Sequence, residues 1–236
     1  MGAYAAGMLS IELVGGSTEA ILALPPEGRG PGVLFVMDAF GLRPRIQEMA
    51  ERIAGWGYVV LAPNVFHADG TVAELAAPEG TQPRWEDVAP RVARLSGAAV
   101  ASDIDGYVAA LRALPEVGDG PLGAVGFCMG GRVAVRAAGR HPEEIAACAA
   151  FHTGGLVTEE ADSPHRGLAG ARAEFLLAHA DNDPSMTPAQ WRCWARPWRP
   201  RAWWRRTWLC RARRTATRCR TPRPGTRQPT SGHSSS

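Results

Sequence analysis

The sequence contains no lysine, so all 26 basic residues are arginine. It also contains no acidic residue after Asp183. Residues 1–190 hold thirteen arginines and all 23 acidic residues, a net charge of −10, whereas residues 191–236 hold thirteen arginines and no acid. The overall net charge of +3 is therefore the average of two unlike parts. This break near Gln190 predicts a domain over residues 1–190 and a separate tail over residues 191–236.

Several kinds of segment are missing, and each absence narrows the class of protein. No apolar run reaches the roughly 20 residues that cross a bilayer. The first twenty residues lack the basic start, apolar run and cleavage site of a secretory signal. The five cysteines are odd in number and lack metal-finger spacing, which favours a reducing compartment over a disulfide framework. We therefore expect a cytoplasmic protein without a membrane span, and 236 residues suit one α/β domain.

Short apolar runs alternate with helical patterns along residues 1–190, which is typical of an α/β fold with a mostly parallel, doubly wound sheet. The first two runs flank "GGSTE" and predict a hairpin, and the later runs predict strands joined by crossover helices. Residues 64–97 lack strong periodicity and predict a long excursion at one end of the sheet, where binding sites often form. We expect strands over 8–14, 20–25, 32–40, 58–63, 122–127, 145–151 and 174–180, and helices over 44–57, 102–115 and 128–140.

The stretch "GFCMGG" (126–131) stands between an expected strand and an expected helix. This is the setting of a nucleophile elbow, G-x-S-x-G, in which a sharp turn lifts the nucleophile above the carboxyl edge of the sheet. Here Cys128 takes the place of serine, and the flanking glycines avoid collisions in so tight a turn. The N-terminus of the following helix favours the thiolate, which is the attacking form. A buried, inert cysteine is the alternative.

Four stretches make the chain similar to the dienelactone hydrolase family of α/β-hydrolases, also called carboxymethylenebutenolidases, over about residues 8–190. They are "MDAFGLRPR" (37–45), "GYVVLAPNVF" (57–66), "GFCMGG" (126–131) and "HADNDPSMTP" (179–188). The resemblance implies an enzyme that cleaves an ester or lactone with a Cys-Asp-His triad and no cofactor. It assigns the nucleophile to Cys128 and the acid to Asp183. Asp181 is the less favoured acid, because it lies two residues nearer the strand.

An oxyanion formed in acyl transfer needs two backbone N–H donors. The architecture implied by the resemblance supplies one from the residue after the nucleophile, Met129, and one from the loop after the third strand, Ala39. A glutamate in that loop contacts the resting cysteine in the family, and the shorter Asp38 stands there in this chain. A turn that caps the following helix explains Asp38 equally well.

Histidine supplies two further candidate features. His152 in "FHTGG" follows an expected strand whose end lies near the site, so it is a candidate for lining the site; a polar loop residue is the simpler interpretation. His179, Asp181 and Asp183 lie close together in the sequence, but His179 alternates within an expected strand and no second cluster accompanies them. We therefore expect no metal site.

The histidine of the triad is missing where the resemblance requires it. The family places it after one more helix and strand, in a pattern like P-G-x-x-H-G-[FY], and no such pattern follows Gln190. The later part of the chain has one histidine, His233, next to its end. Instead, "WRCWARPWRPRAWWRRTW" (191–208) holds six tryptophans and six arginines in eighteen positions.

The genetic code offers an explanation for this tail. If the gene is read one base earlier from about Trp191, residues 191–204 permit V-A-V-L-G-E-A-L-A-A-A-G-V-V, a helix that ends in glycine. Residues 211–221 then permit P-G-A-P-H-G-Y-T-M-S-D, whose histidine falls at Thr215. We therefore hypothesise that residues 191–236 are an out-of-frame translation, and we expect a fold that lacks its last helix, strand and helix and hydrolyses esters poorly or not at all.

A nucleic-acid-binding protein is the alternative function. Arginines neutralise phosphates and tryptophans stack on bases, so the composition of the tail suits single strands. The preceding domain is acidic, which argues against nucleic acid as a partner, and Pro197 and Pro200 spoil an amphipathic helix at a membrane surface. We expect a monomer whose partner is a small ester or lactone.

Overall fold

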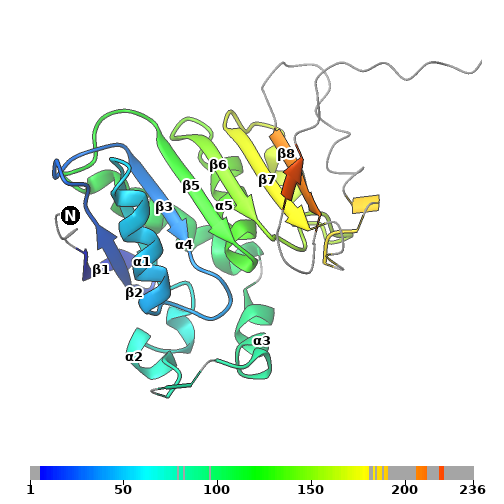
Figure 1. Ribbon diagram of the computed structural model, residues 1–236, viewed down its shortest axis with the longest axis horizontal. Coiled ribbons are helices and arrows are strands. Elements are labelled where there is room, and N and C mark those ends of the chain that lie inside the picture. Colours follow the sequence, from blue (N-terminus) through cyan, green and yellow to red (C-terminus); the bar gives the residue numbers. More distant parts are fainter. Residues whose placement is uncertain are drawn as a thin grey trace, which may run out of the picture.

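The computed structural model describes residues 6–78, 80–81, 83–95, 97–180, 183, 185–187, 189–190, 206–211 and 218–220. Within these residues, nine strands form one sheet in the order β1-β2-β4-β3-β5-β6-β7-β8-β9 (Figure 1). The strands are β1 Ala6–Leu13, β2 Gly16–Ala23, β3 Gly32–Val36, β4 Val59–Pro63, β5 Leu122–Phe127, β6 Ile145–Phe151, β7 Glu174–Ala180, β8 Arg206–Arg211 and β9 Arg218–Arg220.

Strands β3 to β8 pair in parallel, while the hairpin β1–β2 pairs antiparallel with itself and with β4. Every residue of β3 and β4 is buried, as expected for central strands covered on both faces. The helices are α1 Pro44–Ala54, α2 Val72–Leu75, α3 Trp85–Arg94, α4 Gly97–Ala113 and α5 Met129–Arg140, with short 3-10 turns η1 His67–Asp69 and η2 Pro164–Leu168.

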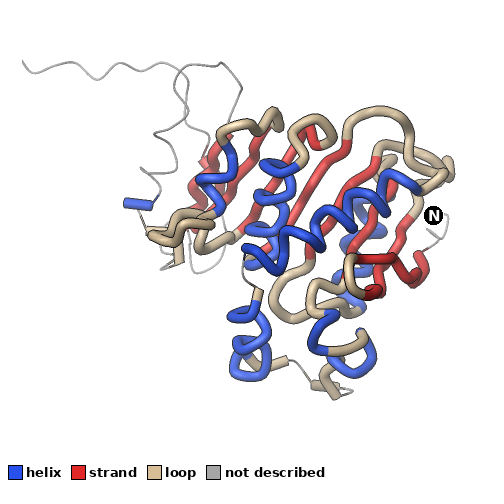
Figure 2. Tube along the Cα trace, turned by 180° about the vertical axis from the view of Figure 1, so that it is seen from behind, coloured by secondary structure: helices blue, strands red, loops and turns tan. Residues whose placement is uncertain are grey.

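Helices cover both faces of the sheet. Helix α1 packs against β2 and β4 on the front face in Figure 1, and α4 and α5 lie behind, where α5 packs against β3, β5 and β6. The same two helices lie in front of the strands when the molecule is seen from behind (Figure 2). The predicted α/β class, doubly wound sheet and opening hairpin are therefore confirmed.

Two predicted boundaries were wrong. The third strand ends at Val36 and not at residue 40, because a turn begins at Asp38, whose carboxylate accepts a hydrogen bond from the Phe40 N–H at 3.0 Å. The helix expected from residue 102 begins at Gly97, whose N–H donates to the Asp162 carboxylate at 3.0 Å. This cap comes from a distant loop, so local sequence does not reveal it.

The excursion over residues 64–97 contains more regular structure than its weak periodicity predicts. It holds η1, α2 and α3 before α4 begins. Helix α2 starts with a capping box, in which the Thr71 side chain accepts from the Glu74 N–H and the Glu74 carboxylate accepts from the Thr71 N–H. Helices α2 and α3 lie below the carboxyl ends of the central strands in Figure 1.

The expectation that the sheet lacks its last strand was also wrong. Strand β8 pairs in parallel with β7, and β9 pairs antiparallel with β8. The segment includes "TWLC", and threonine and tryptophan favour strands. Without β8, the outer edge of β7 would expose unpaired backbone N–H and C=O groups, and such groups readily pair with another strand. No helix in the described part of the chain is both long and apolar enough to cross a membrane.

Candidate active site

Cys128 occupies a strained turn between β5 and α5. Its backbone has φ 54° and ψ −123°, a conformation that residues other than glycine rarely adopt. The Cys128 N–H donates to the Phe151 carbonyl at 2.9 Å, which ties the turn to the end of β6. The predicted strand–turn–helix geometry of a nucleophile elbow is therefore present, and such strain is a common feature of functional sites.

Two glycines make this turn sterically feasible. A Cβ on Gly126 would lie 2.2 Å from the Gly130 carbonyl oxygen, and a Cβ on Gly130 would lie 2.1 Å from the Met37 carbonyl oxygen. Both contacts involve backbone atoms, which have no room to retreat. The glycines thus let the first turn of α5 approach β3 closely enough for the β3–α1 loop to meet Cys128.

Two backbone amides meet at the thiol. The N–H groups of Met129 and Ala39 both hydrogen-bond to Cys128. These are the residues that the sequence singles out as oxyanion donors, and they come from the start of α5 and from the loop after β3. Two N–H groups that converge on one point form a site for a negatively charged atom.

The pKa of the Cys128 thiol lies above its ordinary value. Burial is the largest cause, and the Asp38 carboxylate adds to it, while the hydrogen bonds from Met129 and Ala39 and the positive charge of Arg132 oppose it. The N–H of Met129, at the N-terminus of α5, favours the thiolate as expected, but burial outweighs this effect. The resting cysteine is a thiol that needs a base or a cation for activation.

Asp38 lies in a turn and forms a salt bridge. Its carboxylate accepts two hydrogen bonds from Arg43, at 2.7 and 2.8 Å, and one from the Phe40 N–H. Arg43 in turn stacks over the Phe40 ring, 5.6 Å from its centre. Asp38 therefore closes the turn before α1, which begins after Arg43, and its charge still reaches Cys128.

Asp183 and His152 meet beside the elbow. The His152 Nε2 lies 3.5 Å from the Asp183 Oδ2; the Asp183 side chain is 4% exposed, and that of His152 is 69% exposed. His152 also has a positive φ of 52°, and its N–H donates to the Ala178 carbonyl at 2.8 Å. His152 is thus more than a free loop residue, because it supplies a positive partner to the carboxylate when it is protonated.

Ser185 holds the Asp183 carboxylate in place. Its N–H and its hydroxyl donate to the Asp183 Oδ1 at 2.9 and 2.6 Å. Burial raises the pKa of Asp183, but the Ser185 hydrogen bonds and the charge of His152 outweigh it, so the pKa is lowered overall. Sequence reasoning missed Ser185, although a serine two residues after an aspartate is a common turn pattern.

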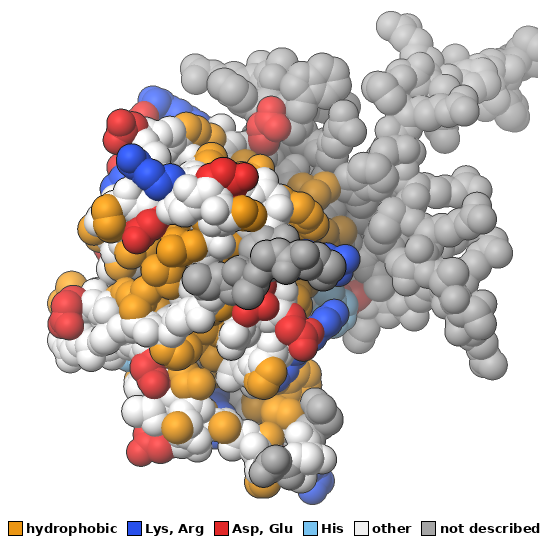
Figure 3. Space-filling view, turned by 60° about the vertical axis from the view of Figure 1, so that its left-hand side comes forward, with side chains coloured by type: hydrophobic (Ala, Val, Ile, Leu, Met, Phe, Trp, Pro, Cys, Tyr) orange, Lys and Arg blue, Asp and Glu red, His pale blue; other side chains and the backbone are white. Residues whose placement is uncertain are grey.

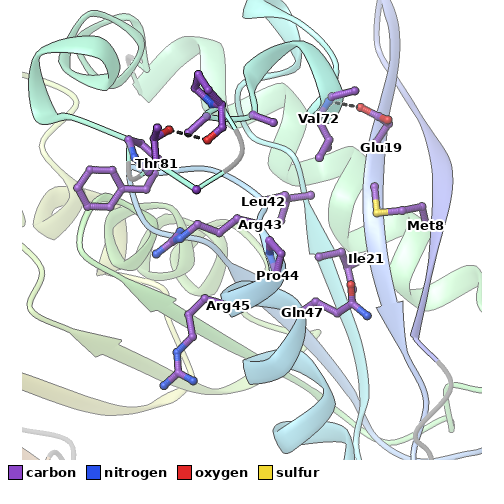
Figure 4. Close-up of a pocket in the computed structure, with 17 residues that line it drawn as sticks. Met8, Glu19, Ile21, Leu42, Arg43, Pro44, Arg45, Gln47, Val72 and Thr81 are labelled. Atoms are coloured by element: carbon purple, nitrogen blue, oxygen red, sulfur yellow. Dashed lines mark hydrogen bonds between the residues drawn. The ribbon is translucent and has the colours of Figure 1, made fainter.

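An apolar groove adjoins the β3–α1 loop. It has a volume of about 770 Å³ and lies between α1, α2 and the hairpin β1–β2. Phe40, which directly follows Ala39, lines it with Leu42 and Arg43 from the same loop (Figure 4). Hydrophobic side chains gather in the middle of the face in Figure 3, with charged side chains scattered around them. This groove is wide enough to accept a small organic molecule.

The described residues contain no group of three side chains that suits a metal ion. Three residues named in the sequence analysis lie outside the described residues: Asp181, Thr215 and His233. Predictions about them rest on the sequence alone. Of the predicted site residues, the structure brings Met129, Ala39 and Asp38 to Cys128, and it brings His152 to Asp183.

Buried His179 makes folding sensitive to acid. It is 1% exposed, and burial lowers its pKa to about 4. In the unfolded chain His179 has an ordinary pKa near 6.5, so the unfolded state takes up a proton first as the pH falls. The contribution of His179 to the free energy of unfolding is therefore complete above about pH 6.5 and is lost as the pH falls toward about 4. We expect a loss of about 2 kcal/mol between pH 7 and pH 5 from this group.

Urea unfolding at pH 7, 6 and 5 measures this effect. The variant His179→Leu should lose less stability on acidification than the unsubstituted chain. Asp183, whose pKa is also lowered, loses its contribution only at lower pH, so it does not interfere in this range. Parallel pH profiles of the two chains would rule out His179 as the cause.

Comparison with known proteins places this chain in a family. The sequence model of the Dienelactone hydrolase family matches residues 18–194. Over 138 residues the chain is 32% identical to a Methylorubrum extorquens protein assigned as a carboxymethylenebutenolidase, which covers 58% of this chain and 45% of that protein. Over 137 residues it is 31% identical to a carboxymethylenebutenolidase of a Pseudomonas species, which covers 55% and 54%. The chain spans about half the length of these curated relatives.

A solved structure shows the same fold. A Klebsiella pneumoniae protein assigned as a dienelactone hydrolase superposes with a TM-score of 0.68 at 23% identity, and the match covers 82% of this chain and 80% of that one. Identity at this level supports the fold and not the activity. Because the family model spans most of the sequence and includes the elbow, the chain belongs to the dienelactone hydrolase family of α/β-hydrolases.

Proposed function

We propose that this protein is built to cleave an ester or lactone, with Cys128 as the nucleophile. The observation that carries the proposal is the convergence of the Met129 and Ala39 N–H groups on the thiol of a residue held in an elbow turn. An inert core cysteine has no need of either feature. Cys148 is such a residue, since it is 2% exposed in the middle of β6.

The chemistry follows from these contacts. The Cys128 thiolate attacks the carbonyl carbon, and the carbonyl oxygen gains a negative charge that the two N–H groups stabilise. The carbon–oxygen bond then breaks, the alcohol takes a proton as it leaves, and a thioester remains on Cys128. Water hydrolyses the thioester to the acid and restores the thiol. A histidine oriented by Asp183 would carry the proton in both halves of the reaction.

The histidine that would carry the proton is not found where the family pattern requires it. The chain has no H-G-[FY] pattern after Gln190, and we propose that residues 191–236 are an out-of-frame translation of the expected C-terminal part, with the histidine encoded at the codon now read as Thr215. Two observations support this proposal: the family model stops matching at residue 194, and all thirteen charged residues after Gln190 are arginine. His152 faces Asp183 but is largely exposed, which suits it poorly for a site that excludes water.

The substrate class follows from the relatives. Two of them carry the name carboxymethylenebutenolidase, an enzyme that opens a lactone, so we propose a small ester or lactone as the substrate. The apolar groove beside Phe40 would hold its hydrocarbon part. The reaction needs no cofactor, and we propose a monomer acting in the cytoplasm.

A burst experiment tests this function. When p-nitrophenyl acetate is mixed with the chain at pH 8, we expect up to one equivalent of p-nitrophenolate, followed by very slow turnover. The reason is that acylation needs mainly the nucleophile and the oxyanion donors, whereas deacylation needs a base to activate water. Mass spectrometry should find the acetyl group on the peptide that contains Cys128.

The matched control is Cys128→Ala, which should abolish the burst, whereas Cys148→Ala should leave it unchanged. Acetylation spread over Cys148 and the cysteines of the tail, with none on Cys128, would overturn the assignment of the nucleophile. Rapid steady turnover by the unsubstituted chain would instead show that a proton carrier is present.

A further inference from the structure

Arg132 lies in the first turn of α5, four positions after Cys128, which stands immediately before the helix. The Arg132 side chain is partly buried, an unusual position for a charged group that is not paired. Within the described residues, Arg132 forms no salt bridge with an acid, unlike the next arginine on the helix, Arg136, which lies 3.6 Å from Asp162.

The guanidinium of Arg132 lies against a glycine. Gly155 has a positive φ of 68°, and a Cβ at this position would lie 3.3 Å from both the Cδ and the Nη1 of Arg132. The backbone of the loop after β6 therefore packs directly against the Arg132 side chain, with no side chain between them. This contact limits the rotamers of Arg132 and holds its charge near the first turn of α5.

A small cavity connects Arg132 with the oxyanion donor. It has a volume of about 320 Å³, and its walls include Met129, Arg132 and Gly155. Glu160 and Asp162 also line it, but Glu160 is exposed and Asp162 pairs with Arg136. The positive charge of Arg132 is thus left to act on Cys128, and the two groups interact electrostatically.

We propose that Arg132 is the cationic partner that stabilises the Cys128 thiolate. This inference rests on the proposed function only in that Cys128 is the nucleophile. Arg132 does not touch the reacting carbon; it is a positioning residue that acts through the charge of the sulfur. A fixed cation near a cysteine lowers the free energy of the thiolate relative to the thiol, which raises the fraction of reactive sulfur at a given pH.

Further charged side chains near Cys128 come from the loops that follow the neighbouring strands. Asp38 from the loop after β3 opposes the thiolate, and Arg43 partly neutralises Asp38 through their salt bridge. His152 follows β6, beside the elbow, and pairs with Asp183. Arg132 is therefore the positive group on α5 that acts directly on the thiol, and it is the one whose removal should change thiolate formation most.

Alkylation with iodoacetamide tests the proposal without relying on ester hydrolysis. The thiol first releases its proton to solvent; the sulfur then forms a bond to carbon as iodide leaves. The rate at Cys128, followed by mass spectrometry of its peptide, rises with pH as the thiolate forms. In Arg132→Met we expect the midpoint of this rise to move up by about one pH unit, and the rate at pH 8 to fall roughly 3- to 10-fold.

The chain offers matched controls. Arg140→Met removes a positive charge two turns farther along α5, where Arg140 pairs with Asp105, and should leave the midpoint unchanged, and Arg132→Lys should largely preserve it. Asp38→Asn should move the midpoint down, because it removes the opposing charge. Gly155→Ala should move it up by less than Arg132→Met, since it only displaces the guanidinium.

Two outcomes would overturn the proposal. One is an unchanged midpoint in an Arg132→Met chain that retains the circular dichroism spectrum of the original; Arg132→Gln serves if Arg132→Met does not fold. The other is an equal shift in Arg140→Met, which would show a general effect of net charge. If the midpoint shifts as expected but no acyl group forms on Cys128 from the ester, the pairing stands and the proposed hydrolase function fails.

Discussion

A chain with the substitution Gly130→Val is expected to lose both its fold and its reactive cysteine. The new Cβ would lie 2.1 Å from the Met37 carbonyl oxygen and 2.5 Å from that of Val36. Both are backbone atoms at the end of a fully buried strand, so neither can move without pulling β3 away from α5. We expect the free energy of unfolding to fall by more than about 4 kcal/mol, which few single substitutions achieve.

Urea unfolding and the p-nitrophenolate burst measure the two losses separately. Gly170→Ala is the matched control, because a Cβ there meets no atom within 4 Å and the residue has no positive φ. That variant should unfold within about 0.5 kcal/mol of the original chain. If Gly130→Val retained full stability and a full burst, the close approach of α5 to β3 would not be needed for the site.

Restoring the other reading frame is expected to give the largest gain in activity. A gene read one base earlier from about Trp191 permits, in place of the arginine-rich tail, a helix and a histidine at the codon that now specifies Thr215. A positioned base contributes roughly 10² to 10⁴-fold to such reactions. We therefore expect steady turnover of p-nitrophenyl acetate to rise by at least about 100-fold over that of the present chain.

Two further chains show where the gain comes from. The frame-restored chain with its new histidine changed to alanine should fall back to a burst without turnover. The present chain carrying only Thr215→His should stay nearly inactive, because a histidine without its supporting elements has no fixed geometry. Sequencing of the gene across the Gln190 codon is the simplest check, and the absence of an H-G-[FY] sequence in the alternative frame would end the hypothesis.

Much of the candidate site is predictable from local sequence. The glycines of "GFCMGG" predict the turn at Cys128, and the order of apolar runs predicts that the loop carrying Ala39 ends at the same edge of the sheet. Both follow from short-range rules: the steric needs of a tight turn, and the common edge at which parallel strands end. The hydrogen bonds of Met129 and Ala39 with Cys128 are in keeping with them.

The parts that escaped prediction depend on contacts between distant residues. Helix α4 begins at Gly97 because Asp162 caps it, and the guanidinium of Arg132 is held by Gly155, 23 positions away. The direction of the Cys128 pKa shift also depends on burial, which only the folded chain reveals. Periodicity and motif spacing carry no information on such contacts.

The order of the strands has a consequence for synthesis of the protein on the ribosome. From β5 onward, each new strand is added at the outer edge of the sheet in the order in which it leaves the ribosome. The outer edge of β7 pairs with the next strand through backbone hydrogen bonds. This pairing depends little on the side chains of the segment that follows. An altered C-terminal sequence can therefore complete the sheet while failing to complete the chemistry. A cell that detects faulty proteins by their exposed sheet edges would retain such a chain, although its sequence lacks the H-G-[FY] pattern after Gln190.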